Sequence, residues 1–537
     1  MTNDFHGPTI VGENRDLVAG RDIVGQKVSA AASWLDRPLS RRQCQLGWLI
    51  AIIVFLGLTS LIGGPVQGDA SVSVYSTWLI SHGHLACAYE VQRDNSLPGL
   101  INPFTHIAPL YPLLTGIVAA ILRIGHSVPF PTSTQLGPHC STATVALFHW
   151  AVNANVIDPT IRIGYLAWLP LMAGVIALLR ASGRGRCRWE PLTLVLVAIV
   201  PPVAMCLTEY FHPQDLLAMG LILIGVARAR ESRWIWAGAL LGLALTTNQF
   251  ALLVWAPLFM VAPRNQKIRF LTWTVIAAAV IDLPFVILSS GRAFGAVIYS
   301  SGSLVSPLGG TLVWETHARG ATLFIVSRLL PPLLALGLGW WAVRRLGPRV
   351  LETLPLISLI ATTLTLRLAL ESNLWGYYFM PLAVMLIVLD VANHRFRRNV
   401  VAWVFVYMLR FNPIPWGFTS NGQPWGITAR LAIPVFIVII SLVFVCFDVA
   451  RRRFTVDLLV SLAITALVIF KIPWTFDQDR HLIPTYLYQI VLVFGGGALA
   501  ISPLIATIRQ GRTWGHGVSN PLEGASPLSS PNPQLPS

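Results

Sequence analysis

Asp69 opens the stretch of the chain whose residue types and spacing best fit acid–base chemistry. It follows the first long apolar run and a Gly-Gly-Pro break at 63–65, and the segment after it is not apolar enough to span a bilayer. At about 100° per residue, one helix face there carries four apolar or aromatic residues with a histidine beside them: Val72, Tyr75, Trp78, Leu79 and His82. The spacing predicts a helix lying on a membrane surface. Asp69 is then either its N-cap, stabilising the helix by ~1 kcal/mol, or a general base at that surface.

A second group of titratable residues lies in one short polar turn between two apolar runs. It contains Glu209, His212 and Asp215. The turn is either a solvated tip in which Asp215 caps the following helix, or an acid–histidine–acid group that could hold a divalent metal. Because the spacing matches no strong metal-binding motif, we prefer the first interpretation.

The composition places these residues in a membrane protein. Of the 537 residues, 54% are hydrophobic and 11% are charged, and the mean hydropathy is +0.65. A soluble chain of this size needs more charge to cover its surface, whereas repeated apolar runs of about 20 residues are what membrane helices require. We predict an all-α, polytopic integral membrane protein with about 12–14 transmembrane helices.

The positive charges indicate which loops face the cytoplasm. The net charge is +15 and the isoelectric point is about 10.1. The arginines stand between apolar runs rather than on a soluble domain, so we expect no nucleic-acid partner and assign the clusters to cytoplasmic loops. The acids and histidines then gather at the outer ends of the helices, so we expect the working face to be extracytoplasmic.

The chain divides into three predicted parts. Residues 1–45 form a disordered cytoplasmic leader, 46–510 a transmembrane domain, and 511–537 a disordered cytoplasmic tail. The first apolar run starts too far from the N-terminus for a cleaved signal peptide. Both termini are therefore placed in the cytoplasm of a multi-pass protein of the bacterial plasma membrane.

Two apolar stretches, 107–124 and 144–157, are ambiguous. Either both cross the membrane or neither does, because the arginine cluster that follows the next span must stay inside. We prefer neither, since prolines interrupt the first and polar residues dilute the second. A large first external loop over 64–159, carrying surface helices, results. Cys87 and Cys140 would share this loop, either as a disulfide or as two unpaired buried thiols.

Charged and polar residues also lie near or inside predicted spans. Arg328 and Arg367 need a partner in hydrocarbon, and either bind a lipid phosphate or reach the headgroups by snorkelling. Asp282 is a candidate acidic partner for such an arginine. The aromatic run at 375–378 is predicted to be an interfacial anchor, and the polar break at 246–249 a helical-hairpin turn.

Together these segments resemble a C-type (GT-C) glycosyltransferase. The matching motifs are GD at 68–69 with Tyr75, Trp78 and HG at 82–83, ACAY at 86–89, APLYPL at 108–113, HPQDLL at 212–217, and AGALLGLA at 237–244 followed by TNQ at 247–249. The last two resemble the HPDLL and AGxLLGLAxxTKQ segments of the polyprenol-phosphate-mannose-dependent mannosyltransferases of actinobacteria, glycosyltransferase family 87. This sequence has Asn248 where that run has lysine, and one acid, Asp69, where a pair is common.

The resemblance implies a role for each candidate residue. Asp69 would deprotonate the hydroxyl of the acceptor, which attacks the anomeric carbon of a polyprenyl-phosphate sugar and inverts it. The leaving phosphate needs cations and hydrogen-bond donors. The candidates for the donor phosphate, chosen by location, are Tyr111, His317, Arg319 and Arg328. The candidates for the substrate pocket are Tyr75, His82, His106, Glu209 and His212.

The expected partners are a polyprenyl-phosphate sugar, with mannose as the first candidate, a cell-envelope glycolipid or glycan acceptor, and membrane lipids. No resident cofactor is implied, because the lipid-linked sugar is a co-substrate, and dependence on a divalent metal stays open. An arabinofuranosyl or other sugar transferase of the same architecture is one alternative. A lipid or glycan transporter (flippase) is the other, although transporters favour internal repeats and the sequence shows none.

Overall fold

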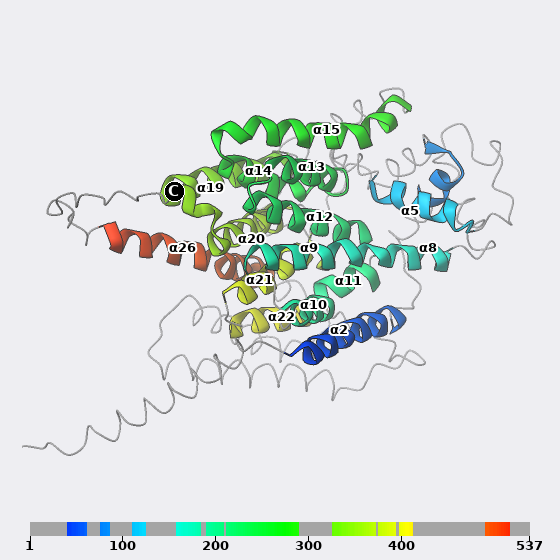
Figure 1. Ribbon diagram of the computed structural model, residues 1–537, viewed down its shortest axis with the longest axis horizontal. Coiled ribbons are helices and arrows are strands. Elements are labelled where there is room, and N and C mark those ends of the chain that lie inside the picture. The colour runs from blue at the N-terminus through cyan, green and yellow to red at the C-terminus, as the bar shows by residue number, and fades with distance from the viewer. Residues whose placement is uncertain are drawn as a thin grey trace, which may run out of the picture.

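The predicted all-α class is confirmed for the part of the chain that the structure describes. The computed structural model describes residues 40–61, 76–85, 110–124, 157–183, 189–208, 211–288, 325–371, 374–393, 397–411 and 489–515. Their regular secondary structure is helical throughout, with no strand in these ranges. The longer helices lie side by side in one bundle, with the short helix α5 near one end (Figure 1).

The helices follow one another in this order. The first half comprises α2 (Arg41–Leu61), α5 (Leu110–Ile121), α8 (Ile157–Gly164), η1 (Tyr165–Ala167), α9 (Trp168–Ala181), α10 (Trp189–Ile199), α11 (Pro201–Thr208), α12 (Pro213–Arg230), α13 (Trp234–Leu245), α14 (Ala251–Val261) and α15 (Arg264–Leu288). The second half comprises η2 (Ile325–Leu329), α19 (Leu330–Leu346), η3 (Gly347–Leu351), α20 (Thr353–Leu370), η4 (Gly376–Phe379), α21 (Met380–Ala392), α22 (Arg398–Phe411), η7 (Val491–Gly495) and α26 (Gly496–Gly515).

Several helices are long and apolar enough to span a membrane. Within the described residues there are four: Pro159–Ala181, Ile325–Leu351, Thr353–Leu370 and Val491–Gln510. The pair α10 and α11 passes the same test but is bent by 64° at its break, so it makes a fifth if it is one broken span. α13 and α14, with 12 and 11 residues, are shorter than the ~20 residues of a full span. The coarser prediction of a multi-pass α-helical membrane protein is supported, and the predicted total number of spans stays a prediction.

The predicted domain boundaries are not tested by the structure, which gives only the ends of the helices near them. The helix α2 begins at Arg41 rather than at residue 46, and α26 continues to Gly515 rather than ending at residue 510. α5 has 12 residues, roughly 18 Å of helix, which is too short to cross a bilayer alone. Residues 1–39, 144–156 and 516–537 lie outside the described residues, so the predictions made for them are not tested.

The helices lie side by side, and the junctions between them lie toward the two ends of the bundle (Figure 1). At one end, Arg180 of α9 binds Glu190 of α10 at 2.7 Å, and Arg230 of α12 donates to the hydroxyl of Thr353 of α20. We call this the basic end, because the helix termini there also carry Arg228, Arg233, Arg344, Arg345, Arg349 and Arg397. The opposite, polar end holds the start of α12, the turn between α13 and α14, and the end of α20. The predicted alternation of the helices across the membrane stays a prediction.

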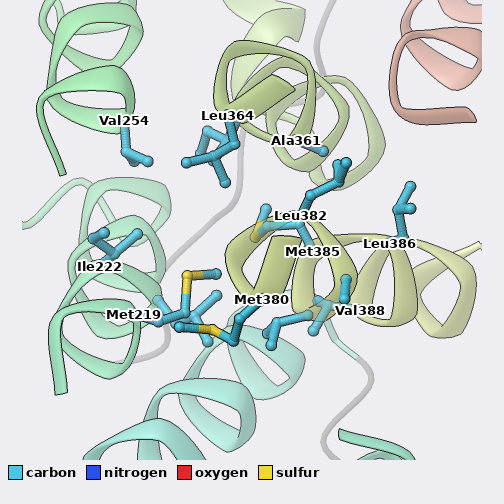
Figure 2. Packing of buried hydrophobic residues seen from close by; sticks show 14 of the residues in the cluster. Met219, Ile222, Val254, Ala361, Leu364, Met380, Leu382, Met385, Leu386 and Val388 are labelled. Carbon is cyan, nitrogen blue, oxygen red and sulfur yellow. The ribbon is translucent and has the colours of Figure 1, made fainter. Parts of the chain in front are cut away.

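The core of the bundle surrounds α21. All 13 residues of this helix are buried, and they pack on α10, α11, α20 and α26. Met380, Met385 and Val388 of α21 lie with Met219 of α12 and Leu364 of α20 in one continuous apolar cluster (Figure 2). The outer faces of α2, α15 and α19 instead expose large apolar side chains, among them Ile53, Val280, Ile287, Leu333 and Trp340. An apolar exterior around a packed interior is what lipid contact requires.

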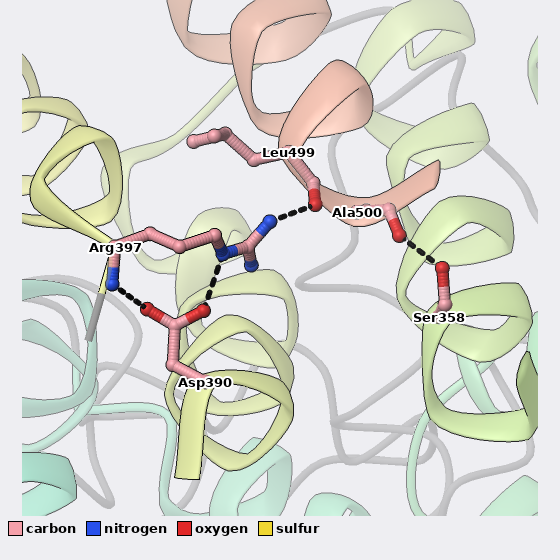
Figure 3. A network of polar contacts seen from close by, with 5 residues as sticks. All are labelled: Ser358, Asp390, Arg397, Leu499 and Ala500. Carbon is pink, nitrogen blue, oxygen red and sulfur yellow. Dashed lines mark hydrogen bonds and ion pairs between the residues drawn. The ribbon is translucent and has the colours of Figure 1, made fainter. Parts of the chain in front are cut away.

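Pro503 interrupts α26, and a neighbouring helix replaces the hydrogen bond that it removes. Proline has no backbone N–H, so the carbonyl of Leu499, four residues earlier, has no helical donor. Arg397 donates to this carbonyl through Nη1 at 2.5 Å (Figure 3). Asp390 of α21 holds the same guanidinium through Nε at 2.5 Å. The arginine thus joins α21, α22 and α26.

A serine of α20 also binds the backbone of α26 next to Pro503. The hydroxyl of Ser358 donates to the carbonyl of Ala500 (Figure 3). The same oxygen accepts the backbone N–H of Leu504 at 3.2 Å. In a regular helix the N–H of Leu504 donates directly to the carbonyl of Ala500, four residues earlier. Here the hydroxyl of Ser358 bridges these two backbone groups.

Candidate functional site

The polar end of the bundle brings together side chains from three separate segments. It contains His212 and Asp215 from the start of α12, Asn248 from the turn between α13 and α14, and Arg367 and Glu371 from the end of α20. Asp215, Arg367 and Glu371 are buried, while His212 and Asn248 are half-buried. We treat this cluster as the candidate functional site, because buried charges need a structural or functional reason.

The backbone before α12 fixes the position of His212. Phe211 is fully buried and has a φ of 49°, in the left-handed region that non-glycine residues seldom adopt. The N–H of His212 donates to the carbonyl of Cys206 at 2.6 Å. The imidazole stacks on the ring of Tyr377, with 3.9 Å between ring centroids and 15° between planes. A side-chain amide, Nε2 of Gln214, lies 2.8 Å from Nδ1 of the histidine.

Asp215 is not the cap of α12. The N-cap residue is His212, and Asp215 lies in the first turn, where a negative charge interacts favourably with the helix dipole. Its carboxylate accepts a hydrogen bond from Nδ2 of Asn248, and Oδ1 of Asn248 accepts the N–H of Phe250 at 3.2 Å. The predicted hairpin turn at 246–249 is confirmed, and it also supplies a partner for a buried acid.

Arg367 neither snorkels nor faces lipid, so both alternatives predicted for it are wrong. Its guanidinium forms an ion pair with Glu371 at 3.3 Å, inside the bundle. Its central carbon lies 4.2 Å from the ring centroid of Tyr378 and 5.8 Å from that of Phe250, so aromatic faces cover the charge. Asp282, proposed as the acidic partner of such an arginine, has a buried Oδ1 with no hydrogen-bond partner in the described part of the chain.

The aromatic run at 375–378 is not a simple interfacial anchor. Trp375 is 39% exposed, as an anchor would be, but Tyr377 is 6% exposed and packs under His212. Tyr378 meets the ring of Tyr377 edge to face and covers Arg367. Two of these aromatic residues therefore belong to the candidate site.

The helix α5 places Tyr111 next to the cluster. The N–H of Leu110 donates to the carbonyl of Thr246 at 3.3 Å, which joins α5 to the turn that carries Asn248. The hydroxyl of Tyr111 lies 2.9 Å from the point that a Cβ on Gly164 would occupy, beside the ring of Phe211. Burial raises the pKa of the Tyr111 phenol well above its ordinary value. Tyr111 therefore stays protonated and keeps a hydrogen-bond donor at this end.

A helical segment at 76–81 packs on the outer side of α5. The hydroxyls of Thr77 and Thr115 are 2.8 Å apart, and Ile80 lies against Gly116. Trp78 and its neighbours from Ser76 to Ile80 are all buried, so this segment is covered on every side rather than lying on a surface with one face free. His82 follows, with Nδ1 at 3.0 Å from the carbonyl of Trp78. The hydroxyl of Ser81 lies at the same distance, 3.0 Å, from this nitrogen.

Three of the predicted site residues are described with their side chains: His82, Tyr111 and His212. Contacts through α5 connect them at the polar end. Asp69, Tyr75, His106, Glu209, His317 and Arg319 lie outside the described residues, as do Cys87 and Cys140. Arg328 lies in the π-helical turn η2, but its side chain is not described.

Sequence reasoning missed Gln214, Tyr377 and the pairing of Arg367 with Glu371. The four-residue spacing of that pair on a helix is a signal that could have found it. The contact of Asp215 with Asn248 joins α12 to the turn between α13 and α14, and no local sequence pattern predicts it. Among the side chains described, no three of the His, Cys, Asp and Glu residues are grouped to hold a metal ion.

Comparison with known proteins adds no relative. No protein-family model, no curated protein and no solved structure matches this chain. The resemblance to C-type glycosyltransferases therefore stays a hypothesis carried by the motifs. The side chains at the polar end are therefore the structural basis for inferring the function.

Proposed function

We propose that this protein is a membrane glycosyltransferase that works at the outer face of the bacterial plasma membrane. It transfers a sugar, with mannose as the first candidate, from a polyprenyl monophosphate to a cell-envelope glycolipid or glycan. The transfer inverts the anomeric carbon, and Asp69 is the general base. The motifs suggest this class, and the polar end is where its substrates would meet.

One observation carries the proposal: His212, Asp215, Arg367 and Glu371 gather at one end of the helices, and arginine clusters occupy the other. Under the positive-inside rule the basic end is cytoplasmic, so the polar end faces outward. Buried acids and an ordered imidazole at that end are the kinds of group that acid–base and phosphate chemistry use. Lipid-linked sugars present their phosphate at the same depth, at the membrane surface.

The proposed step moves one proton and one electron pair. The proton of the acceptor hydroxyl goes to the carboxylate of Asp69, and the oxygen forms a bond to the anomeric carbon. The bond from that carbon to the phosphate oxygen breaks, and its electron pair leaves with the phosphate. His317, Arg319 and Arg328 remain the proposed cations for this charge, and Tyr111 supplies a neutral hydrogen-bond donor.

The test uses membranes that contain the full chain or its Asp69→Asn variant. Both are given radiolabelled polyprenyl-phosphate mannose, and label is measured in extracted glycolipids and glycans. We expect transfer by the wild type and a loss of about a thousandfold or more in the variant, because a base cannot be replaced by an amide. Equal amounts of the two proteins in the membrane are the control. Equal transfer by both proteins would show that Asp69 is a helix cap and not the general base.

A transporter is the second candidate, and the 64° break between α10 and α11 is the observation that favours it. Discontinuous helices line substrate sites in many transporters. Proteoliposomes that hold the purified protein separate the two functions. A transferase releases labelled product on one side, whereas a transporter moves the unchanged lipid-linked sugar between leaflets. Translocation without transfer would overturn the enzymatic proposal.

A further inference from the structure

We propose that five cations around the end of α14 form a binding surface for an anionic phospholipid of the cytoplasmic leaflet. We call it the cationic surface. It consists of Arg264, Lys267 and Arg269 at the start of α15 and of Arg344 and Arg345 at the end of α19. This binding would be independent of the proposed sugar transfer, because it uses the opposite end of the bundle.

Most other arginines described at the basic end already have an acidic partner. The ion pairs there are Arg180 with Glu190, Arg228 and Arg233 with Glu231, Arg349 with Glu352, and Arg397 with Asp390. None of the five residues of the cationic surface forms an ion pair with a residue that the structure describes. The first turn of α15 also contains no acid. Cations close together repel one another, so this surface gains from an anion that comes from outside the chain.

The ends of α14 and α19 pack against each other. A Cβ on Gly339 of α19 would lie 2.8 Å from the Cα of Pro257 in α14. Val261, the last residue of α14, belongs to the same buried cluster as residues from the end of α19. Arg344 and Arg345 lie in the last turn of α19. Their charges are therefore carried to the end of α14.

The start of α15 brings the other three cations to the same place. α15 begins at Arg264, three residues after α14 ends. The ammonium of Lys267 lies 5.3 Å from the ring centroid of Phe259 in α14. On the other side, the guanidinium of Arg344 lies 4.1 Å from the ring centroid of Trp340. Such contacts attract a cation to an aromatic face, so both charges have a defined position at this surface.

Apolar side chains are exposed directly beside these cations. Ile268 is 76% exposed, and the next turn of α15 exposes Leu271 and Trp273. On α19, Trp340 is exposed one turn before Arg344. Tryptophan is enriched where the hydrocarbon of a membrane meets its headgroups. A ligand that covers both parts of this region needs an anionic head and apolar chains, which a phospholipid has and a soluble polyanion lacks.

The chemistry of the cations fits a phosphodiester headgroup. A guanidinium can bind two phosphate oxygens at once, and four of the five cations are arginines. Under the positive-inside rule this end faces the cytoplasmic leaflet, whose surface carries anionic lipids. Each basic residue near such a surface strengthens binding by about fivefold.

The test measures lipid binding to the purified full chain in a non-ionic detergent. Native mass spectrometry compares phosphatidylglycerol with phosphatidylcholine that has the same acyl chains. We expect the wild type to bind phosphatidylglycerol more tightly. The combined variant Arg264→Gln, Lys267→Gln and Arg269→Gln should lose about 100-fold in affinity for it, because three charges of the surface are removed.

A matched control removes the same charge from paired residues at the same end. Arg228→Gln, Arg233→Gln and Arg349→Gln together change the net charge equally, but these arginines already have acidic partners. We expect this variant to stay within about fivefold of the wild type, since exposed charges further away are screened. An equal loss in both variants would show that the net charge matters and not this surface, and would overturn the proposal.

A second variant acts on the other helix of the surface. Arg344→Gln with Arg345→Gln should weaken binding of phosphatidylglycerol by about 25-fold. This variant replaces the α15 variant if the latter does not reach the melting temperature of the wild type in lipid-free detergent. Wild-type affinity in the α19 variant would overturn the proposal.

Two results with the wild type alone would also overturn it. One is equal affinity for phosphatidylcholine and phosphatidylglycerol, which would remove the role of the headgroup charge. The other is equal affinity for glycerophosphoglycerol, the same headgroup without acyl chains, which would assign the surface to a soluble anion.

Discussion

The imidazole of His212 lies nearly parallel to the ring of Tyr377, with 3.9 Å between the two centroids. One residue precedes α12 and the other precedes α21, so the stack joins two loops that are far apart in the chain. The ring of Tyr377 is buried and meets Tyr378, which covers the guanidinium of Arg367. The orientation of the histidine therefore depends on the same residues that shield the buried charge.

Replacing the aromatic ring under the histidine should disturb the site without unfolding the bundle. We expect Tyr377→Leu to reduce sugar transfer by about tenfold, because an aromatic pair contributes about 0.5–1.5 kcal/mol beyond its buried area. Tyr377→Phe keeps the stack and should retain most of the activity. Transfer rates at equal amounts of folded protein are the measurement. A Phe variant as poor as the Leu variant would assign the effect to the hydroxyl instead.

The buried pair of Arg367 and Glu371 should matter far more to stability than an exposed pair. We expect Arg367→Met to lower the free energy of unfolding by about 3–5 kcal/mol, because it leaves a buried carboxylate uncompensated. Arg349→Met breaks an exposed pair with Glu352 at 3.1 Å and should cost less than about 1 kcal/mol. Thermal unfolding in one detergent compares the two. Similar melting temperatures would contradict the importance assigned to burial.

The contacts of Ser358 with α26 next to Pro503 predict energetic coupling between these two residues. We expect Ser358→Ala to destabilise the protein by about 1–3 kcal/mol, since it leaves polar backbone atoms of α26 unsatisfied. In a Pro503→Ala background the helix can make its own hydrogen bonds, so the same serine substitution should cost less. A double-mutant cycle of unfolding free energies measures the difference. Strictly additive effects would show that Ser358 acts independently of the proline.

The two ends of the bundle should lie on opposite sides of the membrane. A cysteine at Trp375, which is exposed at the polar end, should react with a membrane-impermeant maleimide applied to intact cells. A cysteine at Ser232, exposed in the loop after α12 at the basic end, should react only after the cells are opened. The unmodified chain reports labelling of the native cysteines. The opposite pattern would place the polar end in the cytoplasm.

The sequence was sufficient for the features that depend on local pattern. Apolar runs predicted a helical membrane protein, and the polar break at 246–249 predicted a turn. Patterns of this kind depend on residues close together in the chain. They also located His212, which ends a short polar turn before a long helix.

Features that depend on packing could not be predicted in this way. Arg367 has the sequence context of a residue that snorkels, and only the arrangement of α20 against η4 shows that it is enclosed. Tyr377 has the context of an interfacial anchor, but its ring lies under a histidine from another helix. The contact of Gln214 with His212 depends on the backbone conformation before α12, and no local sequence pattern encodes it.

The burial of α21 has a consequence for how the protein is made. The helix contacts α26, which is synthesised more than a hundred residues later. During synthesis α21 therefore enters the membrane before one of its neighbours exists, and lipid or a membrane chaperone must cover that side in the meantime. A chain that terminates before α26 would leave this part of α21 without its neighbour.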